Sequence, residues 1–174
     1  MKFNKFSLLF SVVLSLFLAG GVLAQGGTFS DPDVEYSFDL PETTWKIVAK
    51  PSATNPNVEY VNNERKEGRL EVRKLIVDKN AVMSDIIQTE EQKLRFQLGY
   101  VAGKQDVFGG ALKGMVFNYE YVASGLNMSG RFYFLRANDT TVYVLRFTGL
   151  QNKLQLIRNQ TDSIARTFKV KKGS

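Results

Sequence analysis

The chain has 174 residues, a formal net charge of +6, no Cys and no His. The absence of both residue types excludes disulfides, Ser-His-Asp and Cys-His nucleophile systems, and almost every zinc, copper or haem site. We therefore expect no metal and no cofactor. The Lys and Arg residues alternate with acids, as in the stretch 64–74, whereas phosphate binding requires clustered cations. We therefore also expect no nucleic-acid partner.

Residues 1–24 have the pattern of a secretory signal peptide. Lys2 and Lys5 precede an apolar run over residues 7–19, and the small-residue end at Ala24 is followed by Gln25. The run is too short for a comfortable membrane span, which disfavours the alternative of a retained anchor. Gln25 cannot carry the thioether-linked lipid of a lipoprotein. We therefore expect an exported protein, periplasmic or extracellular, that is soluble and monomeric and has no transmembrane span after cleavage.

The 150 residues that remain (174 minus 24) suit one domain. We expect a flexible lead-in over residues 25–33, the domain over 34–170 and a tail over 171–174. Trp45, which follows a strand-ending proline, is expected to be buried. Apolar alternation between turn sequences predicts strands over residues 34–40, 44–48, 58–61, 70–77, 104–108, 112–122, 128–137 and 141–148.

Two helices are predicted, over residues 84–99 and about 151–166. In the first, Ser84 stands at the N-cap position and Gly99 at the position of a left-handed C-terminal cap. Its apolar stripe packs on a sheet and contains a carboxylate, Glu91. The apolar members of the stripe are Ile87, Leu94 and Leu98.

Short turn sequences join the strands from residue 104 onward, which is typical of an antiparallel meander. The strands 128–137 and 141–148 carry large apolar residues on both faces, as central strands covered above and below do. The fold class is therefore α+β: a central antiparallel sheet of about six to seven strands covered by two helices, in an α/β/α sandwich.

Four segments carry a resemblance to a known family. They are FDLPE at 38–42 before Trp45-Lys46, the strand 109–121, YVLRFTG at 143–149 and IARTF at 164–168. With the order of the elements, they resemble the PsbP-like superfamily, which includes PsbP, DcrB-like and LpqN-like proteins. The resemblance covers residues 33–170 and implies a PsbP-like fold and a non-catalytic binding or accessory role for an exported bacterial member. It transfers no functional residue to a numbered position, and metal-linked roles that use His are not implied.

A partner-binding site is predicted at Phe96 with Lys93 and Arg95. Phe96 lies on the face of the first helix opposite its apolar stripe, beside the two cations. An exposed aromatic of this kind can anchor a partner. The alternative is that the proline-containing loop 50–57 covers it, or that it is simply exposed.

A ligand-binding site is predicted at Glu91, Arg131 and Arg146. Glu91 either lines a pocket as an acid of raised pKa or reaches the sheet edge and pairs with an arginine. Arg131 and Arg146 form the floor of an anion site, unless Arg131 makes a cross-strand ion pair with Glu120.

One acidic cluster, Asp31, Asp33 and Glu35, has the density of a calcium site but lacks the other positions of a calcium-binding loop. A polar lead-in explains these residues equally well. No metal site is therefore predicted.

The function expected from the sequence is that of an exported, non-enzymatic binding or accessory protein of the cell envelope, whose protein or small-molecule partner is not specified by any motif. The alternative is a hydrolase or isomerase that uses Glu91 and Tyr119 or Tyr121, in a pocket between helix and sheet.

Overall fold

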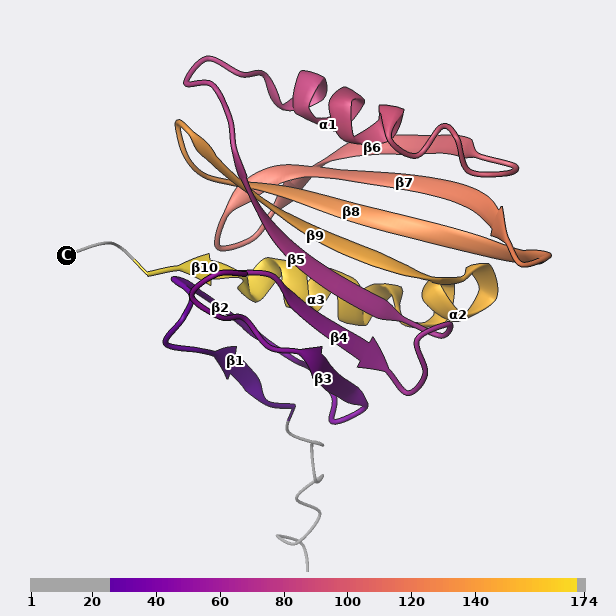
Figure 1. Cartoon of the computed structure of the whole chain (residues 1–174), viewed down its shortest axis with the longest axis horizontal. Helices are drawn as coiled ribbons and strands as arrows, with labels where there is room; N and C mark the ends of the chain where they lie inside the picture. The colour runs from indigo at the N-terminus through magenta and orange to yellow at the C-terminus, as the bar shows by residue number, and fades with distance from the viewer. Residues whose placement is uncertain (1–25, 172–174) are drawn as a thin grey trace, which may run out of the picture.

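The structure, a computed structural model, describes residues 26–171 and contains two antiparallel sheets (Figure 1). The large sheet has seven strands in the spatial order β3-β4-β5-β9-β8-β7-β6. Its strands are β3 (Trp45–Ala49), β4 (Val58–Asn62), β5 (Arg69–Ile76), β6 (Val101–Gly109), β7 (Lys113–Ala123), β8 (Leu126–Asn138) and β9 (Thr141–Leu150). The predicted α+β class, with an antiparallel sheet of six to seven strands, is confirmed.

A small sheet in the order β1-β2-β10 holds both ends of the described chain. Its strands are β1 (Thr28–Ser30), β2 (Tyr36–Asp39) and β10 (Lys169–Val170). The lead-in predicted over residues 25–33 therefore contains a strand. The reason is Phe29, which is buried and stacks on Phe38 with ring centroids 4.9 Å apart.

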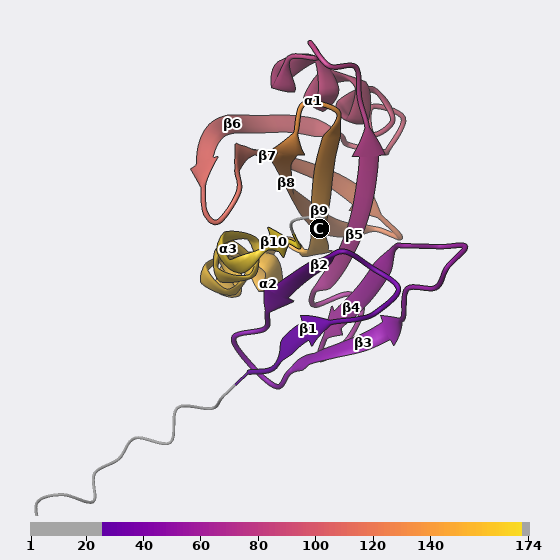
Figure 2. The ribbon, with the colours of Figure 1, turned by 90° about the vertical axis from the view of Figure 1, so that its left-hand side faces the viewer.

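Helices cover both faces of the large sheet (Figures 1 and 2). One face packs against α1 (Met83–Gln92), and the other against α2 (Gln151–Leu156), α3 (Arg158–Thr167) and the small sheet. The single helix predicted over residues 151–166 is divided in two, because the backbone at Ile157 (φ −94°, ψ 13°) leaves the helical conformation. Within residues 26–171, no helix is long and apolar enough to span a membrane.

The predicted bounds and caps of the first helix are wrong. The helix ends at Gln92, and turns occupy the residues before Tyr100. The residue before the helix is Val82, so Ser84 is not the N-cap and no side chain caps this end. Gly99 does adopt a left-handed backbone, with φ of 62°, but within the turns rather than at the helix end.

The buried stripe of α1 is also rotated from its predicted position. Glu90 is buried with 4 % of its surface exposed, whereas Leu98 is 74 % exposed. Glu90 follows Ile86 by four residues and Ile87 by three, so all three lie on one side of the helix. Glu91 therefore lies at the margin of the stripe.

Two central strands, β8 and β9, contribute to the cores on both faces. In β8, Tyr133 and Leu135 belong to the cluster beneath α3, whereas Phe132 and Phe134 belong to the cluster beneath α1. All four side chains are at most 1 % exposed. The prediction that these strands are covered above and below is confirmed.

Trp45, at the start of the edge strand β3, is buried as predicted, with 5 % of its surface exposed. Its ring packs edge-on against Phe147, with centroids 5.9 Å apart. Its indole Nε1 donates a hydrogen bond to Gln160 Oε1 of α3 at 2.9 Å. The side chain therefore fixes the edge of the sheet to the helix that covers it.

Candidate functional site

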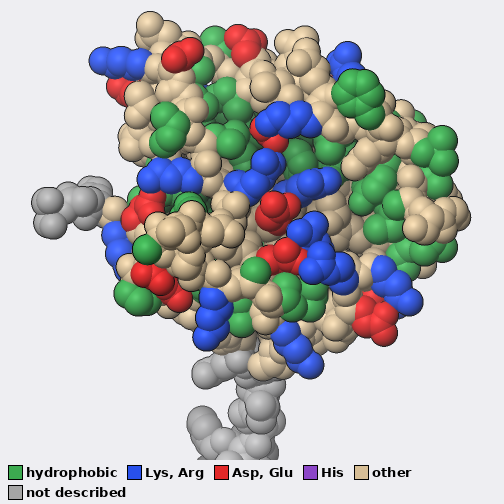
Figure 3. All heavy atoms as spheres, viewed as in Figure 1, with side chains coloured by type: hydrophobic (Ala, Val, Ile, Leu, Met, Phe, Trp, Pro, Cys, Tyr) green, Lys and Arg blue, Asp and Glu red, His purple; other side chains and the backbone are tan. Residues whose placement is uncertain are grey.

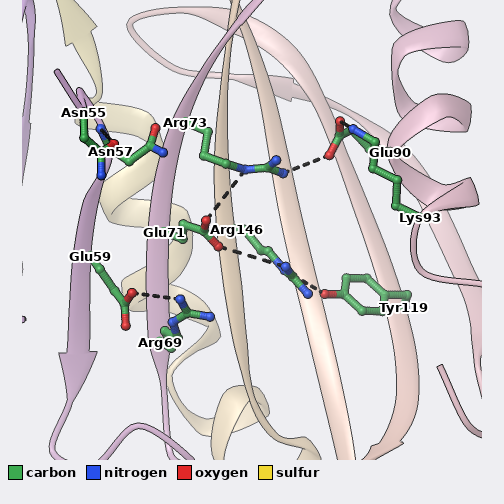
Figure 4. Close-up of polar contacts among 10 residues, drawn as sticks. All are labelled: Asn55, Asn57, Glu59, Arg69, Glu71, Arg73, Glu90, Lys93, Tyr119 and Arg146. Carbon is green, nitrogen blue, oxygen red and sulfur yellow. Dashed lines mark hydrogen bonds and ion pairs between the residues drawn. The ribbon is translucent and has the colours of Figure 1, made fainter. Parts of the chain in front are cut away.

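A group of charged side chains lies on the part of the large sheet beside α1 (Figures 3 and 4). Strand alternation places them there: Leu70 and Val72 of β5 are fully buried in the opposite core, so the residues between and beside them face outward. We call this surface the charged face. It consists of Glu59 from β4, Arg69, Glu71 and Arg73 from β5, and Arg146 from β9.

Glu71 lies at the centre of the charged face, between two arginines. Arg73 Nε is 3.9 Å from Glu71 Oε1, and Arg146 Nη1 is 4.0 Å from Glu71 Oε2. Both distances exceed that of a direct hydrogen bond. The side chains of Arg73 and Arg146 are 25 % and 23 % exposed. The Nε atom of Arg73 is buried and makes no hydrogen bond, so this guanidinium keeps a donor that a closer acceptor could use.

The position of Arg146 depends on Tyr119 of β7, two strands away. Arg146 Nε donates a hydrogen bond to the Tyr119 hydroxyl at 3.2 Å. The Tyr119 ring crosses β8 at Gly130, where a Cβ atom would lie only 2.0 Å from the ring carbon Cζ. Burial raises the pKa of Tyr119 to about 12, even though Arg146 opposes the shift. Tyr119 is therefore a neutral hydrogen-bond partner.

Glu90 connects the charged face to α1. Its Oε2 accepts a hydrogen bond from Arg73 Nη2 at 2.8 Å, and its Oε1 accepts one from Lys93. Burial raises the pKa of Glu90, but the hydrogen bonds from Lys93 and Arg73 outweigh that effect and leave the pKa below its ordinary value. Glu90 is therefore ionised and holds Arg73 in place.

The charged face has a surplus of cations. At its lower edge, Glu59 accepts a hydrogen bond from Arg69 at 2.8 Å and is 2.7 Å from Arg65. The hydrogen bond from Arg69 holds the pKa of Glu59 below its ordinary value. With the residues of the rim included, five cations (Arg65, Arg69, Arg73, Lys93 and Arg146) share three carboxylates (Glu59, Glu71 and Glu90).

Arg131 is not part of this surface, so the predicted common floor of Arg131 and Arg146 is wrong. Arg131 lies opposite Phe147 in the β8–β9 ladder, and Arg146 lies opposite Phe132, which places the two arginines on opposite faces of the sheet. The cause is a β-bulge between Arg136 and Asn138 of β8. Without that extra residue, the tight turn would place both arginines on one face.

Arg131 instead joins the sheet to α3. It donates hydrogen bonds to Asn118 Oδ1 at 2.6 Å, to the Tyr133 hydroxyl at 2.6 Å and to Asp162 Oδ1 at 2.8 Å. The expected ion pair with Glu120 is not formed, because Glu120 lies opposite Ser129 and accepts a hydrogen bond from Gln151. A hollow of about 470 Å³ opens beside this network, with Arg131 and Arg158 in its lining.

Glu91 does not have the surroundings that the enzymatic alternative requires. It accepts hydrogen bonds from Arg95 at 3.2 and 3.3 Å, which is the pairing with an arginine weighed above. The hollow of about 500 Å³ between α1 and β5 is lined by Glu90 and not by Glu91. The tyrosine near Glu91 is Tyr100, whose pKa rises to about 12 through burial and then through the charge of Glu91. Tyr119 instead hydrogen-bonds Arg146.

Phe96 is 94 % exposed, so the proline loop does not cover it. It lies in the turns after α1 together with Arg95, and Lys93 stands at their start. The three residues predicted as a partner-binding site are therefore close together in one exposed segment.

The acidic residues near the N-terminus separate in the structure. Asp31 Oδ1 accepts a hydrogen bond from the backbone N–H of Asp33 at 2.9 Å, whereas Glu35 binds Lys74 and Tyr143. In the part of the chain that the structure describes, no three carboxylates are grouped so that they could hold a metal ion.

The sequence contained a signal for the charged face that our prediction did not use. Arg69, Glu71 and Arg73 alternate with Leu70 and Val72, which predicts that the charged residues share one face of a strand. We used the mixed signs of residues 64–74 only as an argument against a nucleic-acid partner. No sequence pattern indicated that Glu90 and Gly130 belong to this site, because their positions depend on the rotation of α1 and on the register of β8.

The chain has the PsbP/Mog1-like α+β fold. Solved structures similar to it include the Ran-binding protein Mog1p of Saccharomyces cerevisiae (TM-score 0.61, 11 % identity, 84 % of this chain and 96 % of that one). Cyanobacterial PsbP (CyanoP) of Synechocystis sp. PCC 6803 has a TM-score of 0.58 at 14 % identity, over 89 % of this chain and 98 % of that one. LpqN of Mycobacterium tuberculosis, described as involved in cell envelope biogenesis, has a TM-score of 0.53 at 14 % identity, over 85 % and 91 %. No family model and no curated protein matches the sequence. At these identities the likeness defines the fold alone.

Proposed function

We propose that this chain is an exported, non-enzymatic binding protein of the cell envelope that receives an acidic group of its ligand or partner on the charged face. The group is a carboxylate or a phosphate, because both match the planar N–H pattern of a guanidinium. The envelope location rests on the signal-peptide pattern of residues 1–24, which lie outside the residues that the structure describes. The likeness to LpqN, which is described as involved in cell envelope biogenesis, supports an envelope role.

The observation that carries the proposal is the loose position of Glu71 between Arg73 and Arg146, at 3.9 and 4.0 Å. A tight ion pair would consume the N–H donors of both arginines. Here the donors are held in place by Glu90 and Tyr119 while the central carboxylate stays at a longer distance. An incoming anion can therefore bind without first breaking a short ion pair.

The direct test is a nuclear magnetic resonance titration of the arginine side-chain Nε–Hε signals with sodium phosphate and with sodium acetate, at an ionic strength kept constant by sodium chloride. We expect saturable shifts of the Arg73 and Arg146 signals, because these guanidinium groups bind the anion. The double variant R73Q/R146Q should lose the response at the remaining residues of the face. Arg158, on the other side of the sheet, is the internal control.

Equal shifts at Arg158, or no saturable shift at Arg73 and Arg146, would contradict the proposal. The probe itself separates the two ligand chemistries, since phosphate and acetate are titrated independently. A macromolecular partner is tested by capture from the host envelope with wild type, R73Q/R146Q and R158Q. Loss of one captured protein in the double variant, but not in R158Q, is the expected result.

A further inference from the structure

A second surface, which adjoins the charged face at Lys93, is made of exposed apolar side chains. Phe96, Leu98 and Leu126 are 94 %, 74 % and 47 % exposed. We call them the apolar tip. Figure 3 shows hydrophobic side chains gathered at the right-hand end of the molecule, where the segment after α1 and the β7–β8 turn lie in Figure 1.

The apolar tip is held in place by the fold. Leu94, only 5 % exposed, fixes the start of the segment in the core beneath α1. The carbonyl of Leu98 accepts a hydrogen bond from the backbone N–H of Val122 at 2.7 Å, which ties the segment to the end of β7. Leu126 pairs with Ala123 across the adjoining turn. The exposed side chains are thus presented by an ordered backbone.

The charges beside the apolar tip are arranged with the cations outward. The side chains of Lys93 and Arg95 are 60 % and 55 % exposed, whereas the carboxylates that pair with them, Glu90 and Glu91, are 5 % and 13 % exposed. The cationic side chains of both ion pairs therefore face the solvent. Bulky apolar side chains flanked by exposed cations match the two layers of an anionic membrane surface, acyl chains and negative headgroups.

We propose that the apolar tip docks this protein onto a membrane surface that contains anionic lipids, with Phe96 and Leu98 entering the interface and Lys93 and Arg95 contacting the headgroups. A lipid surface accounts for both features of the tip, because the exposed Phe96 and Leu98 suit the acyl layer and the outward-facing Lys93 and Arg95 suit anionic headgroups. Docking through the apolar tip would leave Arg73 and Arg146 of the charged face free to bind a ligand.

The test is vesicle co-sedimentation of the exported form, beginning at Gln25, with mixed phosphatidylcholine/phosphatidylglycerol vesicles and with pure phosphatidylcholine vesicles. Wild type should bind the mixed vesicles more tightly, and added salt should weaken that binding. The double variant F96S/L98S should bind at least about tenfold more weakly, since two large side chains no longer leave water. K93Q/R95Q should lose the preference for the anionic vesicles.

The matched control is L156S, because Leu156 in α2 is exposed to a similar degree, 78 %, but lies outside the apolar tip. It should bind as wild type does. The variant F96W adds a second readout: its emission should shift to the blue when mixed vesicles are added, while Trp45 is already buried. Absence of wild-type binding to mixed vesicles, or equal losses in F96S/L98S and L156S, would overturn the proposal and favour a protein partner at the tip. R73Q/R146Q should bind vesicles normally, so failure here leaves the charged-face proposal standing.

Discussion

Arg73 in β5 donates a hydrogen bond to Glu90 in α1 across 2.8 Å, and this contact is the direct polar link between the charged face and the helix. Glu90 is nearly buried, whereas the neighbouring Glu91 pairs with the exposed side chain of Arg95. Two adjacent carboxylates of one helix therefore have different energetic roles.

We expect Glu90→Ala to destabilise the fold by about 3 kcal/mol, because it leaves Arg73 without its acceptor in a poorly hydrated position. Glu91→Ala is the matched control and should cost less, because Glu91 is more exposed than Glu90 (13 % against 5 %) and its partner Arg95 is 55 % exposed. Both values are measured by urea denaturation. Equal costs in the two variants would show that Glu90 is not the buried member.

The stability of the fold should decrease in acid through Glu35 as well as Glu90. Burial raises the pKa of Glu35, but hydrogen bonds from Lys74 and Tyr143 outweigh it and lower the pKa from 4.5 to about 2. The unfolded state then binds more protons between these values, so this stabilisation is complete above about pH 4.5 and is lost as the pH falls toward about 2. Glu35→Gln should therefore be less stable than wild type at pH 7 and approach it near pH 2.

The readout for this prediction is the urea midpoint over the range from neutral pH to about pH 2. Glu42→Gln serves as the control, because Glu42 is exposed. A constant difference between Glu35→Gln and wild type at all pH values would show that the stabilisation does not depend on ionised Glu35.

Gly130→Ala should disturb the charged face without touching its charges. The new methyl group would lie 2.0 Å from the Tyr119 ring, so the ring must move and its hydrogen bond to Arg146 is lost. We expect a cost of about 1–3 kcal/mol from the overpacking. Gly109→Ala is the control, because nothing lies within 4 Å of its Cβ position. If Tyr119 is the cause, the double variant G130A/Y119A should cost less than the sum of its two single variants.

Trp45→Ala should cost about 3–5 kcal/mol, the usual range for truncation of a buried large aromatic. The variant loses the contact with Phe147 and leaves Gln160 without its indole donor. Trp45→Phe keeps most of the packing and removes only the donor, so it should cost less. A loss under about 1 kcal/mol for Trp45→Ala in denaturant melts would contradict the burial of this residue.

Export predicts a defined N-terminus. We expect the protein purified from the exporting compartment to begin at Gln25, because the small-residue end at Ala24 suits signal peptidase. Intact-mass measurement decides the matter directly. A mass that includes residues 1–24 would instead indicate a retained segment.

The parts of the fold that sequence could predict are those set by local patterns. The strands β7, β8 and β9 follow from apolar runs between short turns, and the fold class follows from those strands and two helices. The end of α1 could not be predicted, because residues 93–98 have good helix propensity. A tertiary contact decides the matter: the carbonyl of Leu98 accepts the backbone N–H of Val122.

The candidate site was harder to predict for the same kind of reason. Arg146 of the predicted ligand site and Lys93 of the predicted partner site both lie at the charged face, but Arg131 was wrongly grouped with Arg146. A single extra residue between Arg136 and Asn138 decides which face Arg131 occupies. A turn sequence shows where two strands meet, but it does not reveal a bulge further along the ladder.

Phe132 and Tyr133 are neighbours in β8, yet they belong to the two different hydrophobic cores. The strand β8 therefore contributes side chains to both cores. Loss of packing in one core should disturb β8 and, through it, the other core. The protein should melt as one cooperative unit, in which a probe beneath α1 and the indole of Trp45 beneath α3 report the same transition. Any binding event that tightens the charged face would then be felt as added stability in the opposite core as well.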